Sequence, residues 1–498
     1  MVRACNVAKR APVALAGALA LALASCKTVG PDFHSPAPPT DAGYLGTGDV
    51  QSPLIQAAQD HSGAGGWWKA LGSAKLDGVM DEALAGNRTL AEANANLERV
   101  RAQAAVTRGA QAPQADFSAG PQGQRINVQS LGFTGFPNPT IFLYNIGGAV
   151  TFDFDLFGRL RRTTEAAEAR AEEEADRTDA AYLTLTGQTA MAALQIAATR
   201  AQIDAVTRAV ANDERLIDLT RRAFEAGGQP RSAVDSLLAQ LAQDQTQLAP
   251  LQQQLAQARH SLAMLVGRTP ATWAVPDFEL ADFSPPAGVP VSLPSRLVRR
   301  RPDILAAEAE LHAATAEVGA ATADLYPDIK LTASITQTTI TPSQIFTYAA
   351  SGWNVAGNLT QPIFHGGALK ARKAAAEADA RAVLARYQQT VISAFVQVAD
   401  VMQAIANDEA ELAALDRSEA AATQTQTDAE LSFRIGGGAL FPVIDAERQL
   451  SLIRRSRATT QARHLADIAQ LFVATAADWR AGRPAERATG APSGAGPQ

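Results

Sequence analysis

Residues 142–156 read FLYNIGGAVTFDFDL, and apolar side chains alternate with polar or small ones along the stretch. Alternation with a period of two is typical of a β-strand that has one apolar and one polar face. Three further segments alternate in the same way, although the one at residues 114–130 does so weakly. We therefore expect four strands, at about residues 114–130, 140–157, 328–342 and 350–364. Such strands suit a membrane β-barrel with a wet interior or a soluble sheet packed on helices.

Four strands are too few to close a barrel. An open sheet edge cannot lie in lipid, because its backbone N–H and C=O groups would have no hydrogen-bond partners there. If the strands lie in a membrane, several copies of the chain must therefore share one barrel, and a trimer would contribute twelve strands. Aromatic residues gather near the ends of the expected strands, where membrane girdles lie, which favours the membrane interpretation.

Outside the strands the pattern changes to that of long helices. Between residues 159 and 226 only Gly187 interrupts the helix-forming residues, and Ile196, Ile203, Val210 and Ile217 recur at every seventh position. Sustained heptads predict helices that pack as coiled coils. A single helix over residues 159–226 would be about 100 Å long at 1.5 Å per residue. A globular domain does not need that length, whereas a tube across a cell envelope does.

The sequence also repeats itself. The stretch LAEANANLERVRAQAAVTRGAQAP at residues 90–113 aligns with ILAAEAELHAATAEVGAATADLYP at residues 304–327. Further on, FEAG at residues 224–227 aligns with FRIG at residues 433–436. The period is far too long for a solenoid unit, so it indicates one fold made of two similar halves. We expect a first repeat at residues 66–290 with long helices at 159–266, and a second at residues 291–480 with long helices at 366–478. The fold class is then mainly α with a membrane β-barrel portion.

The two ends of the chain look different from the repeats. Residues 1–25 carry a basic start and then an apolar run, which predicts a secretory signal peptide. The run ends in LASC at residues 23–26, which resembles the lipobox of bacterial lipoproteins and implies that Cys26 carries a covalent lipid. An ordinary signal followed by a chance cysteine is the alternative. Residues 26–65 predict an extended, lipid-anchored tether, and residues 481–498 a disordered tail.

Composition excludes several classes of function. The formal net charge of −6 argues against a broad nucleic-acid surface. Two cysteines cannot form a disulfide scaffold or a four-cysteine metal site, and the six histidines show no helical pair spacing. No apolar run reaches the roughly 18–20 residues of a membrane helix. Because no nucleophile–base pair, Walker loop or dinucleotide loop is evident, we expect no enzyme, no metal and no cofactor other than the lipid on Cys26.

These features together resemble a TolC-type outer-membrane factor of the NodT-like lipoprotein branch. The matching motifs are CKTVGPD at residues 26–32, Trp67-Trp68, LAMLVG at residues 262–267, RRPDI at residues 300–304 and VIDAER at residues 443–448. The chain departs from the family at ATAADW, residues 474–479, where ALGGGW is common. The resemblance implies a lipid-anchored homotrimer with a twelve-stranded barrel in the bacterial outer membrane and a twelve-helix tunnel in the periplasm. It also implies a passive exit duct for a tripartite efflux system, with a periplasmic adaptor and an inner-membrane transporter of the RND type as partners.

The VIDAER match carries three candidate gate residues over from the family. Phe441 takes the position of a hydrophobic constriction, Asp445 that of an acidic ring, and Arg448 that of a tether between neighbouring helices. Asp445 follows Phe441 by one helical turn, so both project from one face. A packed phenylalanine and a solvated carboxylate are the alternative. The resemblance also gives four helix-tip positions where an adaptor would meet the duct, namely Phe224, Gly227, Phe433 and Gly436. The glycines fit helix C-caps and could serve the turn alone.

Two motifs favour structural roles. Pro302 of RRPDI suits the first turn of a helix, and Asp303 is favourable near a helix N-terminus. We expect Trp67 and Trp68 to pack against the body of the protein. Three alternatives stay open, namely a coiled-coil envelope scaffold or adhesin lipoprotein, a duct for type I protein secretion, and a lipoprotein enzyme. The exported substrate is not readable from the sequence.

Overall fold

The computed structural model describes residues 28–477, except residues 42, 58–65, 128–131, 133, 134 and 136. The expected signal peptide, Cys26 and the tail at residues 481–498 lie outside the described residues. The described chain is mainly helical and folds into two compact units. One unit comprises Met1–Pro36, Asn96–Ala175 and Ala306–Gln388, and the other comprises Ala37–Ala95, Asp176–Leu305 and Gln389–Gln498. Each unit therefore takes segments from both sequence repeats.

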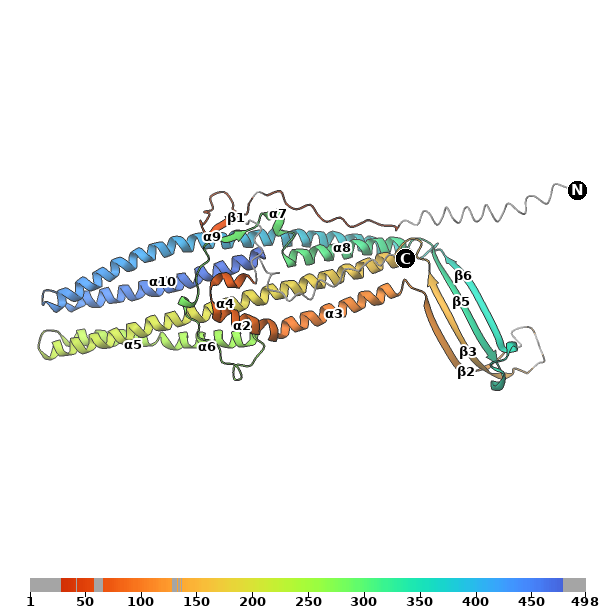
Figure 1. The fold of residues 1–498 in the computed structure, drawn as a ribbon, viewed down its shortest axis with the longest axis horizontal. Coiled ribbons are helices and arrows are strands. Elements are labelled where there is room, and N and C mark those ends of the chain that lie inside the picture. The colour runs from red at the N-terminus through yellow and green to blue at the C-terminus, as the bar shows by residue number, and fades with distance from the viewer. Residues whose placement is uncertain are drawn as a thin grey trace, which may run out of the picture. The chain divides into compact units, whose positions relative to one another are not determined.

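The first unit contains a four-stranded antiparallel sheet (Figure 1). Its strands are β2 (Gln114–Arg125), β3 (Thr140–Asp153), β5 (Asp328–Thr339) and β6 (Ser351–Thr360), in the order β2-β3-β5-β6. Each strand ends a few residues before the alternating pattern does. After β3 the reason is Asp155, which adopts a φ of 44° and accepts hydrogen bonds from the backbone N–H groups of Leu160 (2.8 Å) and Arg161 (2.9 Å). Asp155 thereby caps the next helix and ends the strand.

The strand register places the apolar side chains of all four strands on one face. Phe117 pairs with Gly148, Gly148 with Ile335, and Ile335 with Trp353, so these residues form one row across the sheet. The adjacent row on the opposite face contains Asp116, Ala149, Ser334 and Asn354. Large side chains of the apolar face are exposed to an unusual degree, at 75% for Phe117 and 80% for Trp353. An exposed apolar face of this kind marks a surface that something else covers.

The helices that connect to the sheet are α3 (Arg88–Gly109), α4 (Arg159–Glu225), α8 (Pro302–Ala323) and α9 (Ala368–Arg434). Both α4 and α9 are continuous over 67 residues, and α4 ends one residue before the end expected from its heptads. One 18-residue window of α9 is apolar enough to cross a membrane, by length and composition alone. The window passes on its average over apolar and polar residues, so it does not contradict the expectation that no uninterrupted apolar run reaches that length. The window is weak evidence for a membrane helix, because the core helix of a soluble protein passes the same test.

Residues 28–33 dock on the first unit. The backbone N–H of Val29 donates to the carbonyl of Phe157 (3.2 Å), and the carboxylate of Asp32 pairs with the guanidinium of Arg162 (2.5 Å). The ring of Phe33 stacks on that of His312 at a centroid distance of 4.5 Å. Gly30 lies between these contacts at a φ of +95°. A Cβ on Gly30 would come within 2.4 Å of the Cα of Gly319, so only glycine fits there.

The second unit is built around helical hairpins. It contains the later parts of α4 and α9, together with α2 (Ala74–Gly86), α5 (Arg231–Gln245), α6 (Leu248–Leu265) and α10 (Leu440–Thr475). A short parallel pair joins β1 (Ile55–Ala57), in the expected tether, to β4 (Val289–Val291). Trp67 and Trp68 are buried, and Trp67 stacks on Phe472 and donates from Nε1 to the hydroxyl of Thr186 (3.2 Å). Their expected packing role is confirmed.

The two hairpins of the second unit differ in one respect. The segment that sequence analysis treats as one helical stretch up to residue 266 is two helices, α5 and α6, separated at residues 246–247. Pro250 explains the break, because it has no N–H to donate to the carbonyl one turn earlier. The second repeat has no proline between Val443 and Thr475, and there α10 is continuous over 36 residues.

The RRPDI motif also lies in the second unit, at the start of α8. Pro302 is the first residue of that helix and Asp303 lies in its first turn, as expected. The guanidinium of Arg301 pairs with Asp303 (2.9 Å), donates to the carbonyl of Ala474 (2.9 Å) and reaches Gln397 (2.7 Å). The motif therefore ties α8 to α9 and α10, which is a structural role.

Candidate functional site at the hairpin tips

The two hairpin tips end their first helices in the same way. After α4, the N–H of Gly227 donates to the carbonyl of Phe224 (2.9 Å), and that of Gly228 donates to Ala223 (2.8 Å). The equivalent distances after α9 are 3.1 and 3.0 Å, for Gly436 to Phe433 and Gly437 to Ser432. This pair of bonds defines a Schellman motif, and it requires a left-handed residue at its centre. Gly227 and Gly436 supply that conformation, at φ values of +76° and +77°, which confirms the C-cap prediction.

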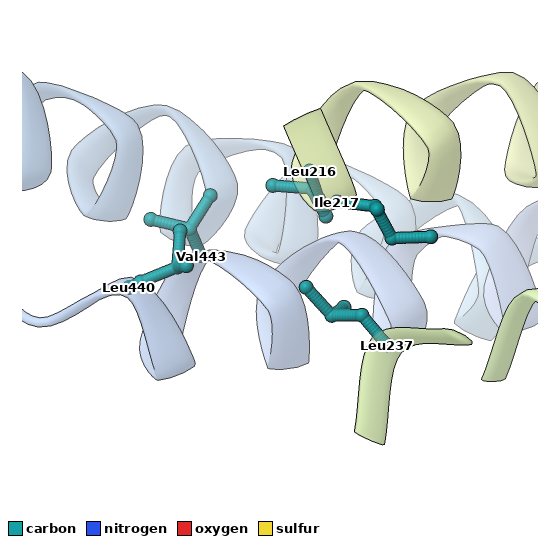
Figure 2. Packing of buried hydrophobic residues seen from close by; sticks show 5 residues of the cluster. All are labelled: Leu216, Ile217, Leu237, Leu440 and Val443. Atoms are coloured by element: carbon teal, nitrogen blue, oxygen red, sulfur yellow. The ribbon is translucent and has the colours of Figure 1, made fainter. Parts of the chain in front are cut away.

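A small hydrophobic core holds the tips together within the second unit. Figure 2 shows it between α4, α5 and α10, with Leu216 and Ile217 facing Leu237, Leu440 and Val443. All five side chains are buried. Phe433 at the end of α9 packs against this core and is only partly exposed, whereas Phe224, its counterpart in the first repeat, is 41% exposed. The two helix-tip phenylalanines are therefore not equivalent in the structure.

The three candidate gate residues lie together on the first turns of α10. Phe441 is 73% exposed, and Asp445 and Arg448 are also exposed. All three line one cavity of about 700 Å³ within the second unit. Residues of α4 and α5 line the same cavity. The ring of Phe441 and the charged groups of Asp445 and Arg448 are therefore all accessible to a neighbouring surface or to a passing solute.

The same cavity contains three carboxyl groups that sequence analysis did not select, two of them buried and that of Asp244 half-buried. They are Asp213 of α4, Asp244 of α5 and Glu447 of α10. Burial and the neighbouring charge of Asp244 raise the pKa of Asp213 to about 7. Burial also raises the pKa of Glu447, although Arg215 partly opposes the shift. Asp244 interrupts a leucine seam at heptad spacing, and that interruption was the one available signal.

A second polar cluster lies between α9 and α10, where the half-exposed Arg463 covers the buried Asp408. The guanidinium of Arg463 donates to Asp408 (2.7 Å) and to Glu411, and Asp408 is almost fully buried. Burial and the adjacent Asp408 raise the pKa of Asp467 to about 6, while burial lowers that of His464. Within the part of the chain that the structure describes, no group of three His, Cys, Asp or Glu side chains is arranged to hold a metal ion.

Comparisons with known proteins agree with this architecture. The family model described as "Outer membrane efflux protein" matches residues 79–268 and 293–477, which correspond to the two sequence repeats. The cation efflux system protein CusC of Escherichia coli is 27% identical over 93% of this chain and 98% of its own length. The probable outer membrane lipoprotein SilC of Salmonella typhimurium is 26% identical over 92% and 96% of the two chains.

Among solved structures, the outer-membrane channel OprN superimposes with a TM-score of 0.83 at 27% identity. The match covers 91% of this chain and 100% of the OprN chain. The family match extends over most of the chain, and the structural match includes both the sheet and the helical hairpins. On this evidence the chain is an outer-membrane efflux channel component and belongs to the outer membrane efflux protein family.

Proposed function

We propose that three copies of this chain form the outer-membrane exit duct of a tripartite efflux system. The observation that carries the proposal is the sheet, which has an exposed apolar face, an opposite polar face, and two outer strands, β2 and β6. Within the described residues neither outer strand has a neighbour on its far side. In lipid such edges must pair, and the simplest partner for β6 is β2 of the next copy. Three copies give twelve strands and a closed barrel with a wet interior.

The long helices continue the duct into the periplasm. Each chain supplies α4 and α9, with α3, α5 and α6 completing the first repeat and α8 and α10 the second. Heptad-spaced side chains are the packing surface that coiled-coil neighbours need. Export through such a duct is passive. An inner-membrane transporter of the RND type supplies the energy, and a periplasmic adaptor joins it to the hairpin tips around Phe224, Gly227, Phe433 and Gly436.

The gate in this proposal is the first part of α10. Phe441 narrows the passage, three copies of Asp445 form an acidic ring that attracts cations, and Arg448 holds neighbouring helices together. The cavity behind these side chains supports the assignment, because it leaves room for α10 to move relative to α4 and α5. Adaptor binding opens the gate by favouring the splayed arrangement of the tips.

The amino-terminal end anchors the duct by a lipid on Cys26. Val29 docks beside Phe157 at the foot of the sheet, and three residues of chain reach at most about 11 Å. The described chain therefore begins beside the sheet, as a lipid anchor just upstream of Val29 requires. The lipoprotein description of SilC supports the same assignment.

A conductance experiment tests the duct and its gate together. The purified full-length protein is inserted into planar lipid bilayers, and the double variant Asp445→Ala, Arg448→Ala is compared with the wild type. We expect a small wild-type conductance and a several-fold larger one for the variant, because the ring charge and the tether are both removed. Arg457→Ala on the same helix is the matched control, since Arg457 pairs with Asp416 outside the cavity.

The outcomes separate the parts of the proposal. If no form of the protein conducts ions, the duct assignment is wrong and an envelope scaffold becomes the better description. If the wild type conducts and the double variant matches it, the duct stands and the gate assignment is wrong.

A further inference from the structure

Two carboxyl groups from different helices meet inside the tip cavity. Asp213 of α4 is 9% exposed, and it lines this cavity together with Asp244 of α5. Both oxygens of Asp244 already accept side-chain amide hydrogens, from Gln240 (3.0 Å) and Gln247 (2.8 Å). Within the described residues, Oδ2 of Asp213 receives no hydrogen bond from any donor. Two ionised carboxylates in one largely enclosed cavity repel each other, so a proton on one of them favours the packed arrangement of α4 and α5.

The other charged groups around the pair do not remove this need. Glu447 of α10 is 8% exposed, and its Oε2 has no hydrogen-bond partner in the described chain. Arg215 of α4 is the cation nearest to Glu447, with 3.4 Å between Nη2 and Oε1, but its side chain is 62% exposed. The remaining charged groups that face the cavity or Glu447 are Asp445, Arg448 and Arg455 of α10 and Glu430 of α9. The negative charge near Asp213 is therefore only partly balanced.

We propose that Asp213 and Asp244 form a proton-binding site that couples periplasmic pH to the packing of the first hairpin tip. With one shared proton the pair joins α4 to α5. When the proton leaves to water in the cavity, the two carboxylates repel each other and the tip loosens. The loosening of the tip is a property of the single chain and does not depend on the proposed gate. Only its effect on export rests on that proposed function.

The position of the pair explains why its charge reaches the tip. Asp213 precedes Ile217 by one helical turn, so both side chains lie on the same side of α4. Ile217 belongs to the hydrophobic core that joins α4, α5 and α10 (Figure 2). Repulsion between Asp213 and Asp244 therefore acts on the two helices that this core holds together. The cavity of about 700 Å³ beside the pair gives water access to the released charges.

The direction of the effect follows from proton linkage. In the packed state the pKa of Asp213 is raised from 3.8 to about 7, so the packed tip binds one proton more than the loosened tip between about pH 4 and 7. Packing is then favoured at low pH and is lost as the pH rises toward neutrality. For a single proton the equilibrium between packed and loosened tips changes by up to about tenfold per pH unit in that window.

Hydrogen–deuterium exchange of the full-length protein measures this directly. Peptides from α5 (Arg231–Gln245) are followed between pH 5.5 and 8, and intrinsic exchange rates are corrected with the unfolded chain. We expect the corrected protection of the wild type to fall by about tenfold or more over this range. Asp213→Asn should keep its protection at every pH, because its amide donates to Asp244 without titrating.

Two further variants keep the result interpretable. Asp244→Asn is the second test of the pair, should Asp213→Asn fail to fold, and it should abolish the pH dependence in the same way. Asp218→Asn is the matched control, since Asp218 is an exposed carboxylate on the same helix that pairs with Arg222 (2.8 Å). It should keep the wild-type pH profile.

A wild-type protection that does not change with pH would overturn the proton site, and so would an unchanged pH dependence in both asparagine variants. Bilayer conductance recorded at the same pH values separates this inference from the duct itself. If the protein conducts ions but its tips show no pH-dependent exchange, the duct assignment stands and the proton site is wrong. If the tips loosen as the pH rises but the protein never conducts ions, the proton site stands and the duct assignment is wrong.

Discussion

Gly30→Ala should detach the amino-terminal segment from the sheet-bearing unit. Gly30 has a φ of +95°, and a left-handed conformation costs a residue with a Cβ about 1–2 kcal/mol. The new Cβ would also lie 2.4 Å from the Cα of Gly319, and overpacking against backbone costs about 1–3 kcal/mol more. The substitution therefore opposes docking by about 2–5 kcal/mol.

The contacts that hold the segment are of similar size. The hydrogen bond from Val29 to Phe157 contributes about 0.5–1.5 kcal/mol. The pair of Asp32 with Arg162 contributes about 0.2–1 kcal/mol, because Asp32 is 64% exposed. Stacking of Phe33 adds about 0.5–1.5 kcal/mol. The opposing free energy of about 2–5 kcal/mol is centred above the total of about 1–4 kcal/mol from these contacts, so we expect detachment rather than a small local shift.

Hydrogen–deuterium exchange at Val29 is the measurement, and Gly48→Ala is the matched control. Gly48 has a φ of +100°, but a Cβ there would meet nothing within 4 Å, so this variant carries the backbone strain without the collision. We expect the Val29 amide to lose its protection in Gly30→Ala and to keep it in Gly48→Ala. Equal protection of Val29 in the wild type and Gly30→Ala would show that the contact with Gly319 does not decide docking.

Two further predictions concern the sheet and the α9–α10 cluster. Val355→Arg should make the free energy of barrel assembly in lipid about 2–4 kcal/mol less favourable, because position 355 lies on the proposed lipid face. Asn354→Arg lies on the opposite face and should be tolerated. Heat-modifiability on gels after refolding into lipid compares the two, and equal assembly would count against a membrane sheet. Arg463→Met should destabilise the second unit by about 2–3 kcal/mol at pH 8, because it leaves the buried Asp408 without its cation. The loss should be smaller at pH 5. The pKa of Asp467 is raised to about 6, so Asp467 and Asp408 together take up a proton as the pH falls through that value. Thermal unfolding at both pH values measures the loss of stability. Arg457→Met is the control, because its exposed ion pair should contribute less than about 1 kcal/mol. A loss of stability in Arg463→Met that is larger at pH 5 than at pH 8 would contradict the predicted direction.

The sequence was most informative where a periodic pattern reports a local geometry. The alternation at residues 142–156 predicts both the strand β3 and its apolar face, and the observed register carries that face across the sheet. The heptads after residue 159 predict a helix that ends at residue 226, and the observed helix α4 ends one residue earlier. The glycines of the two Phe-x-x-Gly turns predict C-caps because the left-handed conformation depends on one residue alone.

Sequence reasoning was weaker where distant residues meet. The break between α5 and α6 follows from Pro250, a single residue within an otherwise helical pattern that continues on both sides of it. The pairing of Asp213 with Asp244 and the proximity of Glu447 depend on how three helices pack, and heptads do not specify which polar side chains face each other across them. The division into two compact units, each drawn from both repeats, is likewise set by tertiary contacts rather than by the duplication.

The central strand pair of the sheet has a consequence for biogenesis. β3 and β5 come from different repeats, and paired residues such as Val150 and Ala333 are about 180 positions apart in the chain. The sheet therefore cannot be completed until the second repeat has been exported across the inner membrane. Until then the hairpin of β2 and β3 presents an apolar face and an open edge to the periplasm, which is an aggregation hazard. We therefore expect the first hairpin to need shielding in the periplasm until the second repeat arrives to pair with it.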